Sequence, residues 1–227
     1  MGPMEYSSVY VTGTDTGIGK TVASSALLHA LRLRGLRAVG MKPLASGCEH
    51  TAAGWRNEDA LALQAASAPR PEYADLNPYA LPLPLAPELA AREAGVTVEL
   101  ATICVAYARL RAQADAVVVE GVGGWAAPLS ASIDQADVVH ALDLPVVMVV
   151  GLRLGCLNHA ILSARAIVAD GCHLLGWIGN AVDPDMARRD EHRAMLDARL
   201  PAPCLGWLPH QATADASGLA RLLTIPD

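Results

Sequence analysis

Short runs of consecutive apolar residues alternate along the 227-residue chain with longer segments whose leucines and alanines recur at helical spacing. A continuous apolar run bounded by turn residues is typical of a strand buried on both faces, as in a parallel sheet. The sequence predicts strands at residues 9–11, 38–41, 116–121, 145–150, 174–180 and 204–207. It predicts helices at residues 21–34, 57–64, 98–114, 138–142, 156–170 and 184–199. This alternation predicts a single α/β domain over residues 1–227, with a doubly wound, mostly parallel sheet.

One strand-to-helix connection has the composition of a phosphate-binding loop. Residues 9–21 read VYVTGTDTGIGKT, which is a strand, a loop of glycine and threonine, and Gly-Lys-Thr at a helix start. Backbone N–H groups and the helix dipole favour an anion there, the lysine reaches the outer phosphates and the threonine hydroxyl holds Mg²⁺. The loop departs from the strict pattern, because Thr14 stands six residues before Lys20. The alternative, a glycine-rich turn that only caps a helix, is disfavoured by the flanking strand and helix. We expect a P-loop NTPase-like fold.

Lysine is rare in this chain. The chain has 17 Lys and Arg residues in total. Only Lys20 and Lys42 are lysines, and all the rest are arginines. Lys42 directly follows the second predicted strand, at the sheet edge where ligands bind in α/β proteins. An ammonium is a compact point charge suited to phosphate oxygens, and arginine does not replace it equally. We expect both lysines to be functional, against the alternative that two lysines survive by accident.

One acidic residue is a candidate for a metal shell beside this loop. Glu120 ends a buried strand and precedes the glycine-rich residues 121–124, the place of the acid that completes a Mg²⁺ shell in nucleotide sites. Asp59 follows Asn57, a suitable N-cap, and its position in a first helical turn is explained by stabilisation of the helix dipole. The start of a later helix, residues 155–158, is either a carboxylate site or an end capped by Asn158.

Composition excludes several classes of protein. The net charge of −6 and the lack of a basic run argue against a nucleic-acid partner. Five scattered cysteines form no disulfide framework, the histidines lack zinc spacing, and neither a signal peptide nor a membrane span is visible. We expect a cytoplasmic enzyme without a membrane partner. Residues 69–87, with six prolines, predict an extended surface connection near the site. The residues alone indicate an ATPase, a kinase or an ATP-dependent ligase and leave the acceptor open.

Four motifs in order extend this interpretation. They are Gly-Thr-Asp-Thr at residues 13–16 before the Gly-Lys-Thr, Lys-Pro-x-Ala-Ser-Gly at 42–47, Glu-Gly-x-Gly-Gly-Trp at 120–125, and Gly-Cys-x-Asn-His at 155–159. Together they resemble the dethiobiotin synthetase family over about residues 9–210. The resemblance implies that 7,8-diaminononanoate, CO₂ or bicarbonate, and MgATP give dethiobiotin, ADP and phosphate. The expected route passes through an N-carbamate and a carbamic–phosphoric anhydride. It also implies a homodimer with active sites at the interface.

The resemblance further assigns residues to each part of the site. Lys42, Lys20 and Thr16 are expected to be catalytic, and Thr21, Asp59 and Glu120 to hold Mg²⁺. Substrate binding is expected at Thr16, Lys42, Ser46, and, from the partner chain, Gly155, Cys156, Leu157 and Asn158. ATP binding is expected at Gly17, Ile18, Gly19, Lys20, Thr21, Val22, Asp59, Glu120, Gly121, Val122, Gly123, Asn180, Ala181, Pro209, His210 and Gln211.

Two other interpretations remain open from the sequence. A partitioning-type regulatory ATPase has a signature lysine five residues before the invariant one, where this chain has Asp15. A cobyrinate-type amidating synthase normally adds a glutaminase domain, for which 227 residues leave no room.

Overall fold

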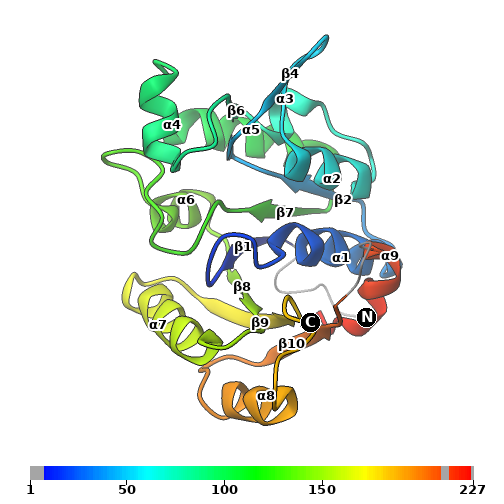
Figure 1. Cartoon of the computed structure of the whole chain (residues 1–227). Helices are drawn as coiled ribbons and strands as arrows, with labels where there is room; N and C mark the ends of the chain where they lie inside the picture. The colour runs from blue at the N-terminus through cyan, green and yellow to red at the C-terminus, as the bar shows by residue number, and fades with distance from the viewer. Residues whose placement is uncertain (1–7, 211–214, 226–227) are drawn as a thin grey trace.

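The computed structural model describes residues 8–210 and 215–225. Its centre is a six-stranded sheet in the order β10-β9-β8-β1-β7-β2, in which neighbouring strands are parallel (Figure 1). The strands are β1 (Val9–Gly13), β2 (Ala38–Met41), β7 (Ala116–Glu120), β8 (Val146–Gly151), β9 (Leu174–Asn180) and β10 (Cys204–Leu208). The predicted doubly wound, mostly parallel sheet is confirmed.

Helices cover both faces of this sheet. One face carries α1 (Lys20–Leu33), α2 (Glu58–Ala66), α9 (Ala216–Leu219) and the 3₁₀ turn η1 (Ala220–Leu222). The other face carries α5 (Leu100–Gln113), α6 (Gln135–Leu142) and α7 (Cys156–Ala169), and α8 (Arg189–Asp197) packs beside α7. The result is a three-layer sandwich.

The two faces explain the continuous apolar runs. In β1, Val9 and Val11 belong to the core beneath α1, whereas Tyr10 belongs to the core on the opposite face. Val118 and Val119 of β7 divide in the same way. Because successive side chains point to opposite faces and both faces are covered, the central strands are apolar along most of their length, and polar residues such as Glu120 and Asn180 stand at their carboxyl ends.

A smaller elaboration lies between β2 and α5. The strand β3 (Leu44–Ser46) pairs in parallel with β6 (Tyr79–Leu81), and β4 (Glu49–Thr51) pairs with β5 (Gly54–Arg56) as an antiparallel hairpin. Two short helices, α3 (Tyr73–Leu76) and α4 (Pro87–Glu93), complete it. The prediction of an extended connection over residues 69–87 is therefore partly wrong. Its backbone finds distant partners, such as the Lys42 N–H that donates to the Leu76 carbonyl at 2.7 Å.

Two helix boundaries also differ from the prediction. The helix predicted at 138–142 begins at Gln135, because Asp134 and Asp137 form a capping box in front of it. The helix predicted at 184–199 is confined to α8, with Arg188 in the left-handed region at its start. No helix in the described ranges combines the length and apolar character needed to cross a bilayer.

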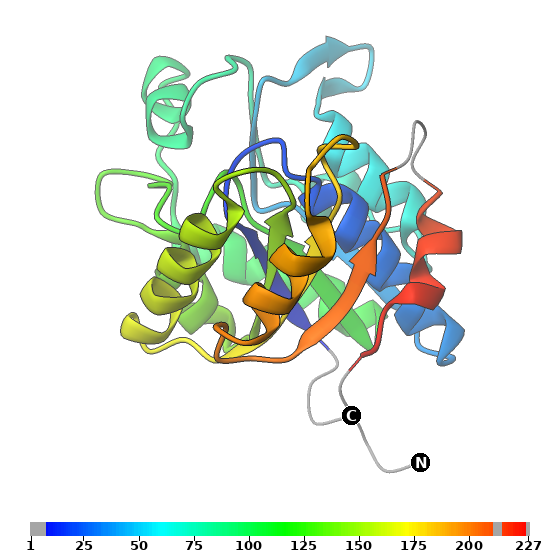
Figure 2. The ribbon, with the colours of Figure 1, turned by 60° about the horizontal axis from the view of Figure 1, so that its bottom comes forward.

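The sheet topology defines where a ligand is expected. Strand β1 lies between β7 and β8, and the chain passes from one side of β1 to the other between these two strands. In open α/β sheets, ligands bind beyond the carboxyl ends of the strands at such a switch point. The loops that follow β1, β8 and β9 come together along this edge (Figure 2).

Candidate active site

The loop between β1 and α1 depends on glycine where its backbone turns. Gly17 and Gly19 have φ angles of 72° and 82°, in the left-handed region that side chains disfavour. A Cβ on Gly19 would also lie 2.1 Å from Nδ2 of Asn180. Gly19 is the N-cap of α1, so the N–H groups of the first helical turn face the loop. This geometry is suited to an anion.

Lys20 is buried at the start of α1, and its charge is only partly compensated. Its Nζ donates to the main-chain oxygen of Asp15 at 2.9 Å. Burial, followed by the positive charge of Lys42, lowers the pKa of Lys20 to about 8. A nearby anion would oppose both effects. The loop is therefore electrostatically prepared for a phosphate.

Four side chains from separate elements converge beside this loop. Nζ of Lys42, just after β2, lies 2.7 Å from Oε1 of Glu120 at the end of β7 and 3.1 Å from Oδ2 of Asp59 on α2. The Thr21 hydroxyl of α1 lies 2.7 Å from Oδ1 of Asp59 and 2.9 Å from Oε1 of Glu120. The three predicted metal-ligating residues and the second lysine thus form one cluster.

The charges within this cluster support one another. Burial disfavours the ammonium of Lys42, but the attraction of Glu120 and Asp59 raises its pKa above the ordinary value. Partial burial likewise disfavours the carboxylate of Asp59, while Lys42 and the Thr21 hydroxyl lower its pKa. Both groups are therefore charged at neutral pH.

The donor set of the cluster fits Mg²⁺. Oε2 of Glu120 is buried and has no hydrogen-bond partner among the described residues. Two carboxylates and a hydroxyl are hard oxygen ligands, and Mg²⁺ commonly takes one or two carboxylates together with water and phosphate oxygens. Across residues 8–210 and 215–225, no group of three or more His, Cys, Asp or Glu side chains could hold a metal by itself. Two carboxylates and one hydroxyl leave coordination positions that water or nucleotide phosphate oxygens can fill.

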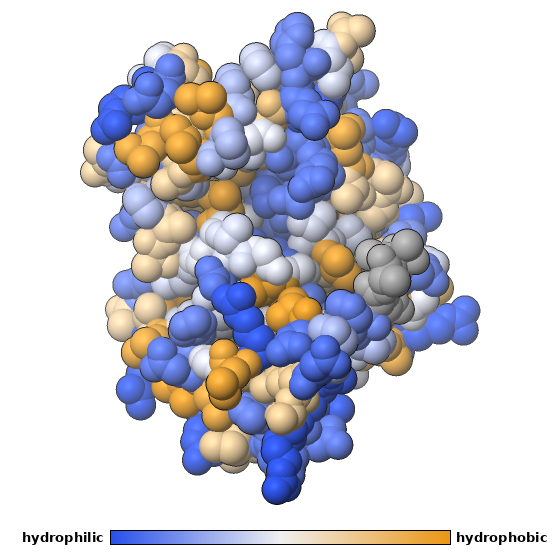
Figure 3. All heavy atoms as spheres, viewed as in Figure 1, coloured by the Kyte–Doolittle hydropathy of each residue, from blue (hydrophilic) through white to orange (hydrophobic). Residues whose placement is uncertain are grey.

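A cavity of about 440 Å³ opens over this cluster. It lies at the switch-point edge, where a hydrophilic strip descends from the β4–β5 hairpin toward the centre of the face in Figure 3. The predicted residues that line it are Thr16, Gly17, Gly19, Lys20, Thr21, Val22, Lys42, Ser46, Asp59, Val122 and Gly123. Glu120 lies beneath it, and the Gly121 carbonyl is 3.2 Å from Nζ of Lys42. The size is adequate for a triphosphate and a small substrate.

A second cavity, of about 230 Å³, continues from the first and shares Gly17, Gly19 and Val22 with it. Four predicted ATP-binding residues, Asn180, Ala181, Pro209 and His210, line this cavity. Asn180 donates through Nδ2 to the Ile18 carbonyl at 2.9 Å and so ties β9 to the phosphate loop. The side chain of Ile18, also predicted to bind ATP, packs in the core and lines neither cavity, and Gln211 lies outside the described residues.

The chain is similar in sequence to known proteins over nearly its whole length. A family model described as an AAA domain matches residues 7–217. The protein named ATP-dependent dethiobiotin synthetase BioD from Xanthomonas euvesicatoria pv. vesicatoria is 66% identical over 98% of this chain and 100% of its own length. The protein of the same name from Xylella fastidiosa is 66% identical over 91% of this chain and 92% of its own length.

The chain belongs to the dethiobiotin synthetase family. It is therefore an ATP-dependent ligase of biotin biosynthesis, as the resemblance of its four motifs implies. Membership selects this interpretation over the partitioning-type ATPase and the cobyrinate-type synthase.

Two solved structures with low sequence identity share the fold. The MinC:MinD cell division complex of Aquifex aeolicus matches with a TM-score of 0.55 and 14% identity, covering 94% of this chain and 86% of that one. The signal recognition particle 54 kDa protein of Aeropyrum pernix matches with a TM-score of 0.54 and 15% identity, covering 98% of this chain and 47% of that one. At these identities the likeness shows the fold alone.

One predicted part of the dethiobiotin synthetase site is absent from the lining of the cavity. The four residues Gly155–Asn158 do not line the cavity over the cluster in the described part of the chain. Gly155 is the N-cap of α7 with φ of 98°, and Asn158 lies in the first helical turn. Capping by Asn158 is therefore excluded, because Gly155 holds the cap position. The neighbouring Leu154 is 87% exposed.

Two polar side chains support the site without having been predicted. Arg153 forms an ion pair with Asp15 and thereby fixes the loop whose carbonyl holds Lys20. Gln135 is fully buried at the start of α6 and donates to the carbonyls of Val122 and Gly124. Sequence patterns gave no signal for either, because each partner is at least 11 positions away in the chain.

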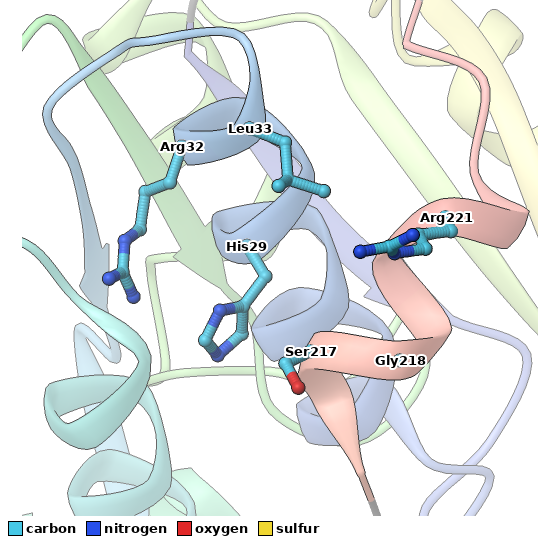
Figure 4. Close-up of a pocket in the computed structure, with 6 residues that line it drawn as sticks. All are labelled: His29, Arg32, Leu33, Ser217, Gly218 and Arg221. Atoms are coloured by element: carbon cyan, nitrogen blue, oxygen red, sulfur yellow. The ribbon is translucent and has the colours of Figure 1, made fainter.

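A further cavity of about 420 Å³ lies between α1 and the C-terminal segment, on the α1 face (Figure 4). Six residues line it, namely His29, Arg32, Leu33, Ser217, Gly218 and Arg221. None of the predicted site residues is among them.

Proposed function

We propose that this chain converts 7,8-diaminononanoate, CO₂ and MgATP into dethiobiotin, ADP and phosphate. The observation that carries the proposal is the convergence of Lys42, Thr21, Asp59 and Glu120 beside the phosphate loop, in one cavity. Family membership supports the overall reaction. The roles of single residues below are part of the proposal.

The first stage is capture of CO₂ by the substrate. One amine attacks the carbon of CO₂ and loses a proton, which gives an N-carbamate anion. Thr16 and Ser46 line the cavity and offer hydroxyl groups to hydrogen-bond the diamine and its carbamate. Fixing both partners in one geometry makes the following steps effectively intramolecular.

The second stage is phosphoryl transfer between two anions. A carbamate oxygen attacks the γ-phosphorus, the bond to the β-phosphate oxygen breaks, and ADP leaves. Lys20 and Lys42 reduce the repulsion between the carbamate and the phosphate and stabilise the charge in transfer. Thr21, Asp59 and Glu120 would hold Mg²⁺, which when bound neutralises charge on the β- and γ-phosphates. The second amine then attacks the carbonyl carbon of the anhydride, expels phosphate and closes the ureido ring.

We further propose a homodimer in which each active site takes residues from both chains. Residues Gly155–Asn158 lie at a helix N-terminus, which favours a carboxylate, yet they are not among the residues that line the cavity of their own chain. In the dimer this segment of the partner subunit would receive the carboxylate of 7,8-diaminononanoate.

The test is ADP release by the purified protein with MgATP, in the presence and absence of bicarbonate and 7,8-diaminononanoate. We expect release that requires both, with dethiobiotin detected by mass spectrometry. Slow release that is indifferent to the diamine would refute the proposed substrate while leaving the nucleotide site in place.

A further inference from the structure

The ammonium of Lys42 lies among the oxygens that are proposed to hold Mg²⁺. Its Nζ is 2.7 Å from Oε1 of Glu120 and 3.1 Å from Oδ2 of Asp59, and the Thr21 hydroxyl contacts the same two carboxylates. The side chain is only 3% exposed, and Glu120 is fully buried. The chain therefore supplies a cation of its own to the acidic pair.

We propose that Lys42 is a placeholder for the metal in the free enzyme. In this state its ammonium excludes Mg²⁺ from Glu120 and Asp59. Mg²⁺ that arrives with ATP displaces the ammonium, and Lys42 then moves to the γ-phosphate and the carbamate. The inference rests on the magnesium site proposed above and adds a second, earlier task for the same lysine.

The charge of the cluster requires a cation at all times. Glu120 is buried, and an unpaired buried carboxylate is strongly disfavoured. With neither Lys42 nor a metal, the two carboxylates that share the Thr21 hydroxyl would repel each other. The ammonium of Lys42 offsets this repulsion and holds the two carboxylates together until the metal arrives.

The side chain of Lys42 is suited to such an exchange. A lysine carries a point charge on a flexible four-carbon stem, so its ammonium can move while its backbone stays fixed. Its backbone is well fixed here, because the Lys42 N–H bonds to the Leu76 carbonyl at 2.7 Å and Nδ2 of Asn77 donates to the Lys42 carbonyl at 2.7 Å. When the metal binds, the ammonium of Lys42 therefore moves to the γ-phosphate, where it joins Lys20 and Mg²⁺ in stabilising the negative charge.

The proposal predicts a gain of metal binding when the lysine is removed. Mn²⁺ binding to the nucleotide-free, full-length protein is measured by electron paramagnetic resonance for wild type, Lys42→Gln and Lys42→Met. We expect both variants to bind Mn²⁺ at least about tenfold more tightly than wild type, since no ammonium competes. Circular dichroism checks that each variant is folded.

Two further variants identify the site of the gain. Lys20→Gln removes the neighbouring lysine, whose Nζ bonds to the Asp15 carbonyl and not to the carboxylates, so Mn²⁺ affinity is expected to change less than about threefold. The double variant Lys42→Gln/Glu120→Gln is expected to lose the gain. The placeholder role is wrong if folded Lys42→Gln and Lys42→Met bind Mn²⁺ no better than wild type.

A second experiment separates failure of the proposed magnesium site from failure of the placeholder role. It measures Mn²⁺ binding in the ternary complex of protein, metal and nucleotide analogue. Mn²⁺ binding is repeated in the presence of a non-hydrolysable ATP analogue, with wild type, Glu120→Gln and Asp59→Asn. If neither variant weakens ternary Mn²⁺ binding, the proposed ligands are wrong and the placeholder role fails with them. If both variants weaken it while Lys42→Gln shows no gain without nucleotide, only the placeholder role is overturned.

Discussion

At the scale of single residues, the role of Lys42 in turnover can be tested separately from nucleotide binding. This lysine lies beyond the phosphate loop, directly after β2, and contacts Asp59 and Glu120 rather than the loop backbone. We predict that Lys42→Gln lowers dethiobiotin formation by about 10²–10³-fold, because a charge that stabilises the transferring phosphoryl group is lost. MgATP affinity should change less than about threefold, because removing the ammonium that competes with the metal offsets the loss of its contact with the γ-phosphate. Turnover and ATP titration measure the two effects, and wild-type turnover would contradict the assignment.

Glu120 provides a second test at the same scale. Its Oε2 has no partner among the described residues, so the metal is expected to satisfy it. We predict that Glu120→Gln raises the Mg²⁺ concentration for half-maximal activity by about 10–100-fold, the usual cost of disturbing a metal shell. Glu99→Gln, an exposed acid before α5, is the matched control and should leave the titration unchanged. An unchanged Mg²⁺ titration for Glu120→Gln would remove this residue from the shell.

Single residues differ in how far the sequence predicts their positions. Lys20 and Thr21 follow from a local motif, and Lys42 and Glu120 follow from their places at strand ends, which a parallel sheet brings to one edge. Asp59 is different, because only the resemblance distinguished it from a residue that stabilises a helix dipole. Arg153 could not be predicted, since its ion pair with Asp15 joins positions 138 residues apart.

At the scale of elements, the phosphate loop depends on a backbone conformation and on a close approach by β9. Gly19 has φ of 82°, and a Cβ there would meet the Asn180 amide. We predict that Gly19→Ala destabilises the fold by about 1–3 kcal/mol and weakens MgATP binding at least about tenfold. The free energy of unfolding is measured in urea, and affinity is measured by calorimetry.

A second glycine provides a control that tests backbone strain without a change at the nucleotide site. Gly35, which follows α1, has φ of 85°, and a Cβ there would meet nothing within 4 Å. Gly35→Ala should therefore lose a similar free energy of unfolding through backbone strain while keeping wild-type affinity for MgATP. Equal loss of affinity in the two variants would show that the effect on nucleotide binding is general instability.

The elements also show why the sequence predicts one part of the fold better than another. The central strands are buried on both faces, so each is a continuous apolar run that stands out from its surroundings. The β4–β5 hairpin is short and largely exposed, and β3 and β6 are three residues each. Their pairing is decided by contacts between distant segments rather than by local periodicity. Such elements leave no pattern that a single sequence can reveal.

At the scale of the whole molecule, one described chain brings together the nucleotide groups but not the expected carboxylate segment. Residues Gly155–Asn158 do not line the cavity that holds Lys42 and Ser46. Exposed apolar side chains flank this segment, with Leu154 at 87% and Leu162 at 55% exposure. A second copy of the chain would bury such residues and supply the missing contact. The proposed shared site therefore accounts for both observations.

Mixed dimers test this arrangement directly. Lys42→Gln is defective in the cavity, and Asn158→Asp places a negative charge where the substrate carboxylate is expected. If sites are shared, a mixed dimer has one doubly defective site and one wild-type site. Random pairing then makes half of the dimers mixed, so equal amounts of two inactive variants should regain about a quarter of wild-type activity.

If each site lies within one chain, mixing restores nothing, because every chain keeps its own defect. Unfolding and refolding the two variants together permits exchange, and separately refolded samples are the control.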